Sequence, residues 1–421
     1  MRFGAHYLPT YVPRLEGSVH RFYGLVFEQM EELERLGFHD VWVTEHHFSG
    51  YGGTIPHPPS FLAAIARTTR RIRLGVAISV LALHQPLEVA ESYAMVDVIS
   101  DGRLEFGVGK GSEAVEYRRM GLSQETATRH MKEATDIIRR AWSDEPVNYR
   151  GELFEYRDVS VLPKPVQRPH PPIWAGAAKS EDTFRWAGEN GFHLMTLPYM
   201  YETPDFLRKN IAVYREALSE AGHGPREVLG KFHVYVSDSR DRAVEESAPY
   251  LQNYHDAHAA ADPERLRKMR RHDNFAAEME QGFIIAGDPE RCIDAIYRWR
   301  EEVGLTALSG TFHFGGIGVA LELLEQFVRR LAEDVDQHID AATVSHADDQ
   351  LLYPGCAALL DKVVQHRNEA FASFQGEALL PDEAGMQVPF DAFGTGQLFE
   401  DAAAFRVTQP GRYSAEFKML A

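Results

Sequence analysis

The sequence predicts an α/β protein built as a closed (β/α)8 barrel, a TIM barrel, with insertions and a C-terminal appendage. Three observations support this fold class. Short β-rich runs alternate with longer helical patterns along most of the chain. The runs are apolar on both faces, which is typical of a parallel sheet covered by helices. Eight such runs, each followed by a helix, favour a closed barrel over an open doubly wound sheet.

The first half of the chain contains four of the strand–helix units. We expect strands at residues 2–8, 40–47, 72–80 and 103–111. The helices that follow them are expected at 18–36, 58–69, 86–100 and, as one long charged helix, beyond residue 111 as far as about Trp142. Gly37 ends the first helix, as glycine commonly does.

The second half follows an insertion at about residues 143–170, which is Pro-rich and yet carries apolar alternation. Strands are then expected at 172–178, 192–199, 231–237 and 308–315, and helices at 180–191, 203–222, 287–304 and 319–339. A second insertion, polar and helical, is expected at about 241–282. Asp288 and Pro289 give the helix at 287–304 a capping residue and a proline in its first turn.

The barrel therefore takes residues 1–339, and residues 340–421 remain as a C-terminal extension. The extension has too little apolar periodicity for an independent domain, but it carries many apolar and aromatic residues that water would penalise. We expect it to pack on the barrel or at a dimer contact.

The composition restricts the partners of the protein. Acidic residues outnumber basic ones by 62 to 44, which gives a net charge of −18. That charge repels nucleic-acid phosphate and anionic membranes. The sequence shows no run of about 18 apolar residues and no signal-peptide pattern, so a cytoplasmic location is expected. The two cysteines, Cys292 and Cys356, lack metal-ligand spacing.

Polar residues gather where the predicted strands end. In a barrel of this kind the active site lies at the carboxyl ends of the strands. The strand ends contribute Glu45, His46 and His47, then Ala77, Ile78 and Ser79, then Gly109 and Lys110, then Ala178, Lys179 and Ser180, and finally His313. Core packing does not require Glu-His-His, so the sequence predicts a functional site at these ends.

A metal centre is the less favoured interpretation of the histidines. Neighbouring residues on a strand point to opposite faces, so His46 and His47 do not readily chelate one ion. The first strand offers only His6, whereas a barrel metallohydrolase is expected to carry two histidines there. His255 and His258 lie in a polar helical region, where a solvated face is the simpler interpretation. No metal site is predicted.

Ser180 and Thr183 open a predicted helix directly after the fifth strand. Free backbone N–H groups and the helix dipole make such a position an anion site, although Ser-x-x-Thr is also an ordinary helix cap. Lys110 lies between two glycines at the end of the neighbouring strand, where it adds positive charge and the glycines let the backbone approach a ligand. Together these residues indicate a phosphate site.

Six segments, in the right order, make the chain resemble the bacterial-luciferase-like flavin monooxygenases over roughly residues 1–338. The segments are MRFGAHYLPTY, DVWVTEHHF, RIRLGVAISVL, DGRLEFGVGKG, PIWAGAAKSEDTFRWAGENG and GDPERCIDAI. The resemblance implies a barrel that binds FMN, supplied in reduced form (FMNH2) by a separate flavin reductase. It also implies reaction with O2 to a flavin peroxide that oxygenates a small organic substrate. Because dimers are common in the family, we expect a homodimer.

The resemblance further implies roles for individual residues. His46 matches the histidine beside the flavin, which assists formation and breakdown of the peroxide, and is the expected catalytic residue. Ser180 and Thr183 match hydroxyls that hold the FMN phosphate. Lys110 stands where luciferase has an arginine. Gly109 occupies the place of luciferase's reactive cysteine, so this chain departs from luciferase there, and neither an aldehyde substrate nor light emission is expected.

The resemblance also places a non-prolyl cis peptide in the third strand, here between Ala77 and Ile78, behind the flavin ring. Glu45 and Ala178 lie beside these strand ends and complete the expected set. The cofactor-binding residues predicted from the sequence are therefore Glu45, Ala77, Ile78, Gly109, Lys110, Ala178, Ser180 and Thr183.

The role implied for His46 agrees with its chemistry. A flavin performs the oxygen chemistry itself, and the protein holds the ring, excludes water and offers a proton donor or acceptor. Histidine can be either near neutral pH. A core histidine bonded to the backbone is the alternative for His46. For the whole chain, the alternatives are a deazaflavin-dependent hydride-transfer oxidoreductase and a non-catalytic flavin-binding partner subunit.

Overall fold

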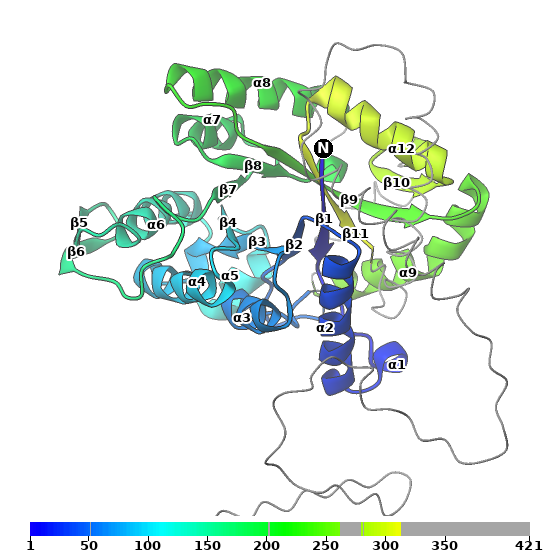
Figure 1. Cartoon of the computed structure of the whole chain (residues 1–421), viewed down its shortest axis with the longest axis horizontal. Helices are drawn as coiled ribbons and strands as arrows, with labels where there is room; N and C mark the ends of the chain where they lie inside the picture. The colour runs from blue at the N-terminus through cyan, green and yellow to red at the C-terminus, as the bar shows by residue number, and fades with distance from the viewer. Residues whose placement is uncertain (51, 201–202, 262–278, 281, 313–421) are drawn as a thin grey trace, which may run out of the picture. The chain divides into compact units, whose positions relative to one another are not determined.

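The computed structural model describes residues 1–312 apart from 51, 201–202, 262–278 and 281. Within these residues the chain forms a TIM barrel, as predicted (Figure 1). The parallel barrel strands are β1 (Arg2–Tyr7), β2 (Asp40–Val43), β3 (Arg73–Val80), β4 (Leu104–Gly109), β7 (Ile173–Gly176), β8 (His193–Thr196), β9 (Val228–Val236) and β11 (Ala307–Thr311). Their order is β11-β1-β2-β3-β4-β7-β8-β9, and the pairing of β9 with β11 closes the ring.

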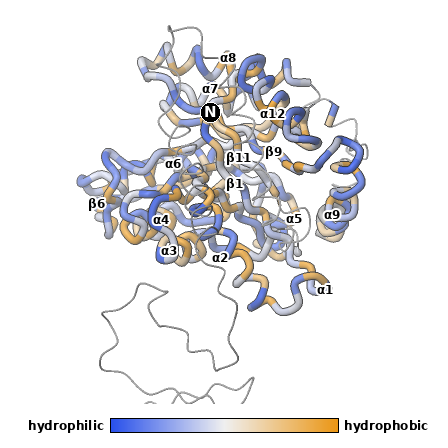
Figure 2. The backbone as a smooth tube through the Cα atoms, turned by 45° about the vertical axis from the view of Figure 1, so that its right-hand side comes forward, coloured by the Kyte–Doolittle hydropathy of each residue, from blue (hydrophilic) through white to orange (hydrophobic). Residues whose placement is uncertain are grey.

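Helices surround the strands (Figure 1). They are α1 (Pro13–Glu16), α2 (Val19–Arg35), α3 (Pro58–Thr68), α4 (Pro86–Ser100), α5 (Ala114–Met120), α6 (Ala127–Ala141), α7 (Glu181–Glu189), α8 (Pro204–Glu220), α9 (Arg240–Ala261) and α12 (Pro289–Arg298). Hydrophilic and hydrophobic colours alternate along α8 and α12 in Figure 2, as expected of amphipathic helices that lie on a core. Asp288 caps α12 by accepting a hydrogen bond from the N–H of Arg291, which confirms the predicted cap.

Several elements differ from the sequence prediction. The strand expected at 40–47 ends at Val43, so His46 and His47 lie in the loop beyond it. The long charged helix expected as far as Trp142 is two helices, because Gly121 ends α5 with a left-handed φ of +70°. The strand expected at 192–199 ends at Thr196, and a 3-10 turn begins at Pro198. A strand that the prediction lacks, β10 (Ile284–Gly287), pairs in parallel with the last residues of β9.

The first insertion forms an antiparallel hairpin of β5 (Val147–Arg150) and β6 (Glu155–Val159), and the second begins as α9. The helix expected at 319–339, the extension at 340–421 and His313 lie outside the described residues. In the described part of the chain, no helix has the length and apolar character needed to cross a membrane. The cytoplasmic location, the homodimer and the packing of the extension stay predictions.

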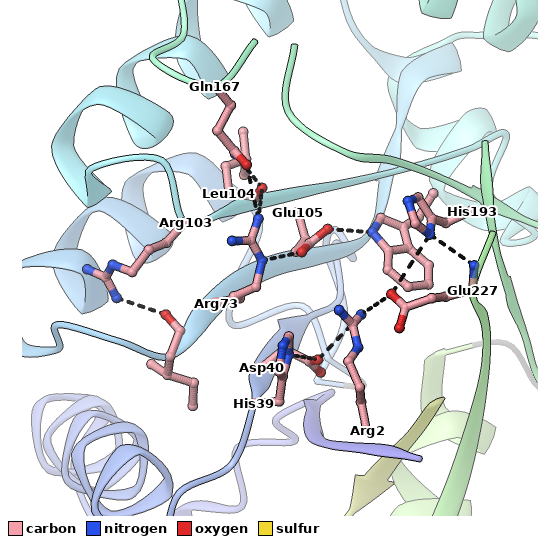
Figure 3. Close-up of polar contacts among 12 residues, drawn as sticks. Arg2, His39, Asp40, Arg73, Arg103, Leu104, Glu105, Gln167, His193 and Glu227 are labelled. Carbon is pink, nitrogen blue, oxygen red and sulfur yellow. Dashed lines mark hydrogen bonds and ion pairs between the residues drawn. The ribbon is translucent and has the colours of Figure 1, made fainter. Parts of the chain in front are cut away.

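Ion pairs link the amino-terminal ends of the barrel strands (Figure 3). Arg2 on β1 lies 2.7 Å from Glu227, which precedes β9, and 3.9 Å from Asp40 on β2. Arg73 on β3 pairs with Glu105 on β4. Charges of opposite sign therefore alternate across neighbouring strands. This end of a TIM barrel contributes stability, and the opposite end is left for function.

An apolar cluster fills the barrel interior. Trp42 and Trp174 meet edge to face with ring centroids 5.2 Å apart. Met195, Leu229 and Ala307 complete the buried cluster, and Ala77 and Ile78 pack against it. Because Met195, Leu229, Ala77 and Ile78 also line the cavity described next, this cluster forms the floor of that cavity.

Candidate active site

A cavity of about 490 Å³ opens at the carboxyl ends of the barrel strands. Its walls come from residues at or just beyond the ends of β2, β3, β4, β7, β8 and β9, with further residues from α5, α6 and β10. A concave site of this size accommodates a small-molecule ligand or cofactor. The cavity lies where the sequence prediction places the functional site.

The structure brings all the predicted site residues to this cavity. His46 lines it together with Glu45, Ala77, Ile78, Gly109, Lys110, Ala178, Ser180 and Thr183. They come from the ends of four neighbouring parallel strands, β2, β3, β4 and β7, or from the residues just beyond them, and the parallel pairing brings those ends together. Their roles toward a ligand stay predictions.

His46 is bound to a carboxylate on α5. Its Nδ1 lies 3.0 Å from Oε1 of Glu116, and the side chains are 14% and 4% exposed. The same oxygen accepts the backbone N–H of His47 at 2.8 Å. His46 thus has an acidic partner, the arrangement of a positioned acid or base. When Nδ1–H donates to Glu116, Nε2 is the ring nitrogen that can exchange a proton with a ligand.

Glu45 is buried, and protein groups bind both of its carboxylate oxygens. Oε1 accepts from Nε2 of His47 at 3.0 Å and from Nε2 of His84 at 2.6 Å, while Oε2 accepts the backbone N–H of Val80 at 3.0 Å. Burial alone raises the pKa of Glu45, but these hydrogen bonds and the charge of His84 lower it to about 2. Burial lowers the pKa of His84, but the hydrogen bond and charge of Glu45 outweigh this and raise it.

The same three residues are the only metal-like cluster in the described part of the chain. Side-chain ligand atoms of Glu45, His47 and His84 lie within 4.8 Å of one another. Both histidine nitrogens already stand at hydrogen-bonding distance from Oε1 of Glu45. The sequence analysis considered His46 with His47 and missed His84. The structure separates His46, which binds Glu116, from His47, which binds Glu45.

The peptide bond between Ala77 and Ile78 is cis, as the resemblance implies. The Ile78 side chain fills the space beside Gly109 on the neighbouring strand. A Cβ atom added at Gly109 would lie 1.9 Å from Cδ1 of Ile78. The reactive cysteine that luciferase carries at this position therefore has no room here unless Ile78 moves.

The predicted phosphate site lies at the rim of the cavity. Ser180 is the N-cap residue of α7, but its hydroxyl makes no capping hydrogen bond, and it is exposed. Thr183 is half-buried one turn into the helix, and Lys110 and Lys179 are exposed. The Tyr117 hydroxyl donates to the carbonyl oxygen of Lys110 and fixes the loop that carries the lysine. Hydroxyls, a helix N-terminus and two cations therefore line one part of the rim.

Sequence reasoning missed several side chains of this site. Glu116 lies in the stretch predicted as one long charged helix, where nothing distinguishes it from the other charged residues. His84 follows the third strand after a short 3-10 turn, beyond the predicted end of that strand. Lys231 and His233 line the cavity from β9. A period-two reading of the strand 231–237 would have placed these two on one face, because a single residue, Phe232, separates them.

A family model described as "Luciferase-like monooxygenase" matches residues 15–307. An uncharacterized protein, y4wF, of Sinorhizobium fredii is 30% identical over 297 residues, which cover 68% of this chain and 84% of that protein. The oxygenase component of a flavin-dependent trigonelline monooxygenase from Acinetobacter baylyi is 30% identical over 226 residues, 52% of this chain and 61% of that protein.

Solved structures share the fold. A monooxygenase of Streptomyces bottropensis, RslO1, matches with a TM-score of 0.73 and 27% identity, over 80% of this chain and all of that one. The oxygenating constituent of 3,6-diketocamphane monooxygenase from Pseudomonas putida, solved with FMN, has a TM-score of 0.63 at 19% identity. The match covers 79% of this chain and 98% of that one. An F420-dependent secondary alcohol dehydrogenase has a TM-score of 0.61 at 22% identity, and the match covers 77% of this chain and 98% of that one.

Proposed function

This chain belongs to the luciferase-like monooxygenase family and is a flavin-dependent enzyme, and from that premise we propose that it is the oxygenase of a two-component system. It would take reduced FMN from a separate reductase and use O2 to oxygenate a small organic substrate. The observation that carries the proposal is the convergence of a carboxylate-bound histidine and a rim of hydroxyls and cations on one cavity of about 490 Å³. A relative named as an oxygenase component supports the need for a reductase.

The residues present fit FMN. Ser180 and Thr183 offer hydroxyls at a helix N-terminus, and Lys110 offers a cation for the phosphate. Ala77, Ile78 and Gly109 form a wall on which a flat ring can lie, since Ile78 fills the space that a side chain at Gly109 would take. Bound reduced FMN supplies the electrons that activate O2.

His46 is the proposed acid or base of the reaction. The bond to Glu116 orients the ring, and Nε2 is the nitrogen proposed to hold or release a proton at the ligand. Apolar side chains of the cavity, among them Leu8, Met195 and Ile284, limit the access of water to the reacting atoms. Glu45 is proposed to position other residues of the site, since its oxygens bind His47, His84 and the backbone at the end of β3.

The deciding experiment mixes the protein with reduced FMN and then with aerated buffer in a stopped-flow spectrophotometer. We expect a transient absorbance in the near ultraviolet that precedes the band of oxidised flavin, and slower return of that band than with free reduced FMN. Reoxidation at the rate of free flavin would favour a non-catalytic flavin-binding subunit. Binding of reduced deazaflavin in preference to reduced FMN would instead favour the hydride-transfer alternative, for which the fold also serves.

A further inference from the structure

Strand β9 presents a lysine to the interior of the cavity. Side chains alternate along a strand, and Leu229, Lys231 and His233 share the face that lines the cavity. Phe232, between them, points away from the cavity and packs on Trp299, with ring centroids 5.2 Å apart. The alternation fixes Lys231 as an inward-pointing residue.

Lys231 is a buried cation without a protein partner in the described part of the chain. It is only 6% exposed. Two other buried or half-buried cations of the barrel have polar partners: the Arg103 guanidinium donates to backbone carbonyls and to the Thr69 hydroxyl, and Arg73 pairs with Glu105. Lys231 is therefore unlike the cations that only stabilise the barrel.

An unpaired ammonium group in such a place is unfavourable until something pairs with it. Burial lowers the pKa of Lys231 to about 7, which expresses the cost of holding the charge away from water. An anionic oxygen that enters the cavity would offset that cost by forming a charge-assisted hydrogen bond. The lysine therefore favours ligands that bring an anion.

The strand order separates Lys231 from the proposed flavin wall. In the ring β11-β1-β2-β3-β4-β7-β8-β9, strand β9 stands opposite β3, which carries the Ala77–Ile78 peptide. Ser180, at the proposed phosphate site, follows β7. A ring lying on the Ala77–Ile78 wall leaves the space between it and β9 for the second ligand, so the anion that meets Lys231 belongs to that ligand.

We propose that Lys231 binds an anionic oxygen of the organic substrate, and that the substrate class is a carboxylic acid or an organic molecule of comparable acidity. The inference rests on the proposed function in one respect, since it takes the flavin to lie on the β3 wall. It adds that the pocket selects its substrate by charge as well as by shape. Lys231 contacts the substrate and so determines specificity.

The test compares small acids with their neutral amides: acetate with acetamide, benzoate with benzamide, and octanoate with octanamide. Isothermal titration measures each affinity near neutral pH, with and without oxidised FMN, for the wild type, Lys231→Met and Lys209→Met. Methionine keeps the length and apolar stem of lysine, and replacing an unpaired buried charge by an apolar group favours folding. Lys209 is an exposed lysine on α8 and serves as the matched control.

We expect at least one acid to bind the wild type and Lys209→Met about ten-fold or more tightly than its amide. In Lys231→Met that preference should disappear while the affinity for FMN stays within about three-fold. The proposal is overturned if no acid of the set is preferred over its amide, or if the preference persists in Lys231→Met, which would assign it to the rim at Lys110.

The result is independent of the proposed function in one further way. If the protein fails to bind FMN, the proposed function fails, but the comparison of acids and amides without FMN still decides the role of Lys231. If Lys231→Met instead loses FMN affinity more than about ten-fold and leaves the acid preference unchanged, the lysine faces the flavin and the proposal is wrong.

Discussion

Nδ1 of His46 lies 3.0 Å from Oε1 of Glu116, a residue 70 positions later in the chain. The histidine follows β2 and the glutamate lies in the first turn of α5, so the pair joins the loops beyond β2 and β4 across one edge of the cavity. The same carboxylate oxygen holds the backbone N–H of His47. Glu116 therefore sets both the ring orientation of His46 and the backbone that carries it.

Glu116 is expected to act as a positioning residue. Glu116→Ala should lower turnover by roughly 10- to 100-fold, the range for partners that orient a functional histidine. Glu116→Gln should lower it less, because an amide oxygen can still accept both hydrogen bonds. Single-turnover rates with reduced FMN measure the effect, and FMN affinity serves as the control. Equal loss in the two variants would contradict a role in orientation.

His46 itself should contribute to the chemical step and little to flavin binding. His46→Ala is expected to lower turnover by about 10²–10⁴-fold, as for loss of a general acid or base. Its affinity for FMN, followed by flavin fluorescence, should stay within a few-fold of the wild type. Unchanged turnover would assign His46 to packing, and His47 or His313 would then be the next residues to test.

The phosphate site should distinguish FMN from riboflavin. Lys110→Ala should weaken FMN binding by about 1.5 kcal/mol, the low end of the range for a charged hydrogen bond, because Lys110 is exposed. Riboflavin affinity should not change, since riboflavin lacks the phosphate. Fluorescence titration of both ligands, with Lys209→Ala as the control, decides the point. Equal affinity of the wild type for FMN and riboflavin would contradict the predicted phosphate site.

Local sequence signals account for what could be predicted. Apolar runs marked the barrel strands, and Asp288 with Pro289 marked the start of α12. The predicted catalytic and cofactor-binding residues, such as His46 and Ser180, line the cavity because a parallel barrel gathers the strand ends that carry them, whereas His47 and Ser79 do not line it. The resemblance to a family added the position of the cis peptide, which composition and periodicity do not indicate.

The rest depends on contacts between distant segments. Glu116 meets His46 from a residue 70 positions away, because the loops beyond β2 and β4 lie close together. The end of α5 at Gly121 depends on a left-handed residue inside a charged, helix-like stretch. Strand β10 has four residues and takes its conformation from pairing with β9. Lys231 has an ordinary place in an alternating strand, and only the folded barrel shows that it is buried with no anionic partner among the residues that the structure describes.

Substitutions at Ile78 and Gly109 should have non-additive effects on the free energy of unfolding. A Cβ atom at position 109 meets Cδ1 of Ile78 at 1.9 Å, so Gly109→Ala forces Ile78 to move. The expected cost is about 1–3 kcal/mol in the free energy of unfolding, as for an overpacked core. Adding Ile78→Val, which removes Cδ1, should recover most of it. Urea unfolding of the single and double variants measures this coupling, and additive effects would contradict it.

Glu45 and His84 should titrate as a pair. The pKa of His84 is expected above its ordinary value of 6.5, because the Glu45 carboxylate favours the charged imidazole. In Glu45→Gln it should be lower than in the wild type, since only the charge of Glu88 then opposes the effect of burial. NMR titration of His84 measures both values. A His84 pKa that is the same in the two proteins would mean that the carboxylate does not charge the ring.

The same carboxylate should govern stability in acid. Its pKa is lowered from 4.5 to about 2, so its contribution is complete above the unfolded value and is lost as the pH falls toward 2. Between neutral pH and pH 3 the wild type should lose about 2 kcal/mol of unfolding free energy that Glu45→Gln does not lose. Urea unfolding across this range measures the difference, with Glu125→Gln as an exposed control. The NMR titration of His84 gives the contribution of that ring in each protein. A difference in unfolding free energy between the two proteins that stays constant over this range would show that folding does not lower the pKa of Glu45.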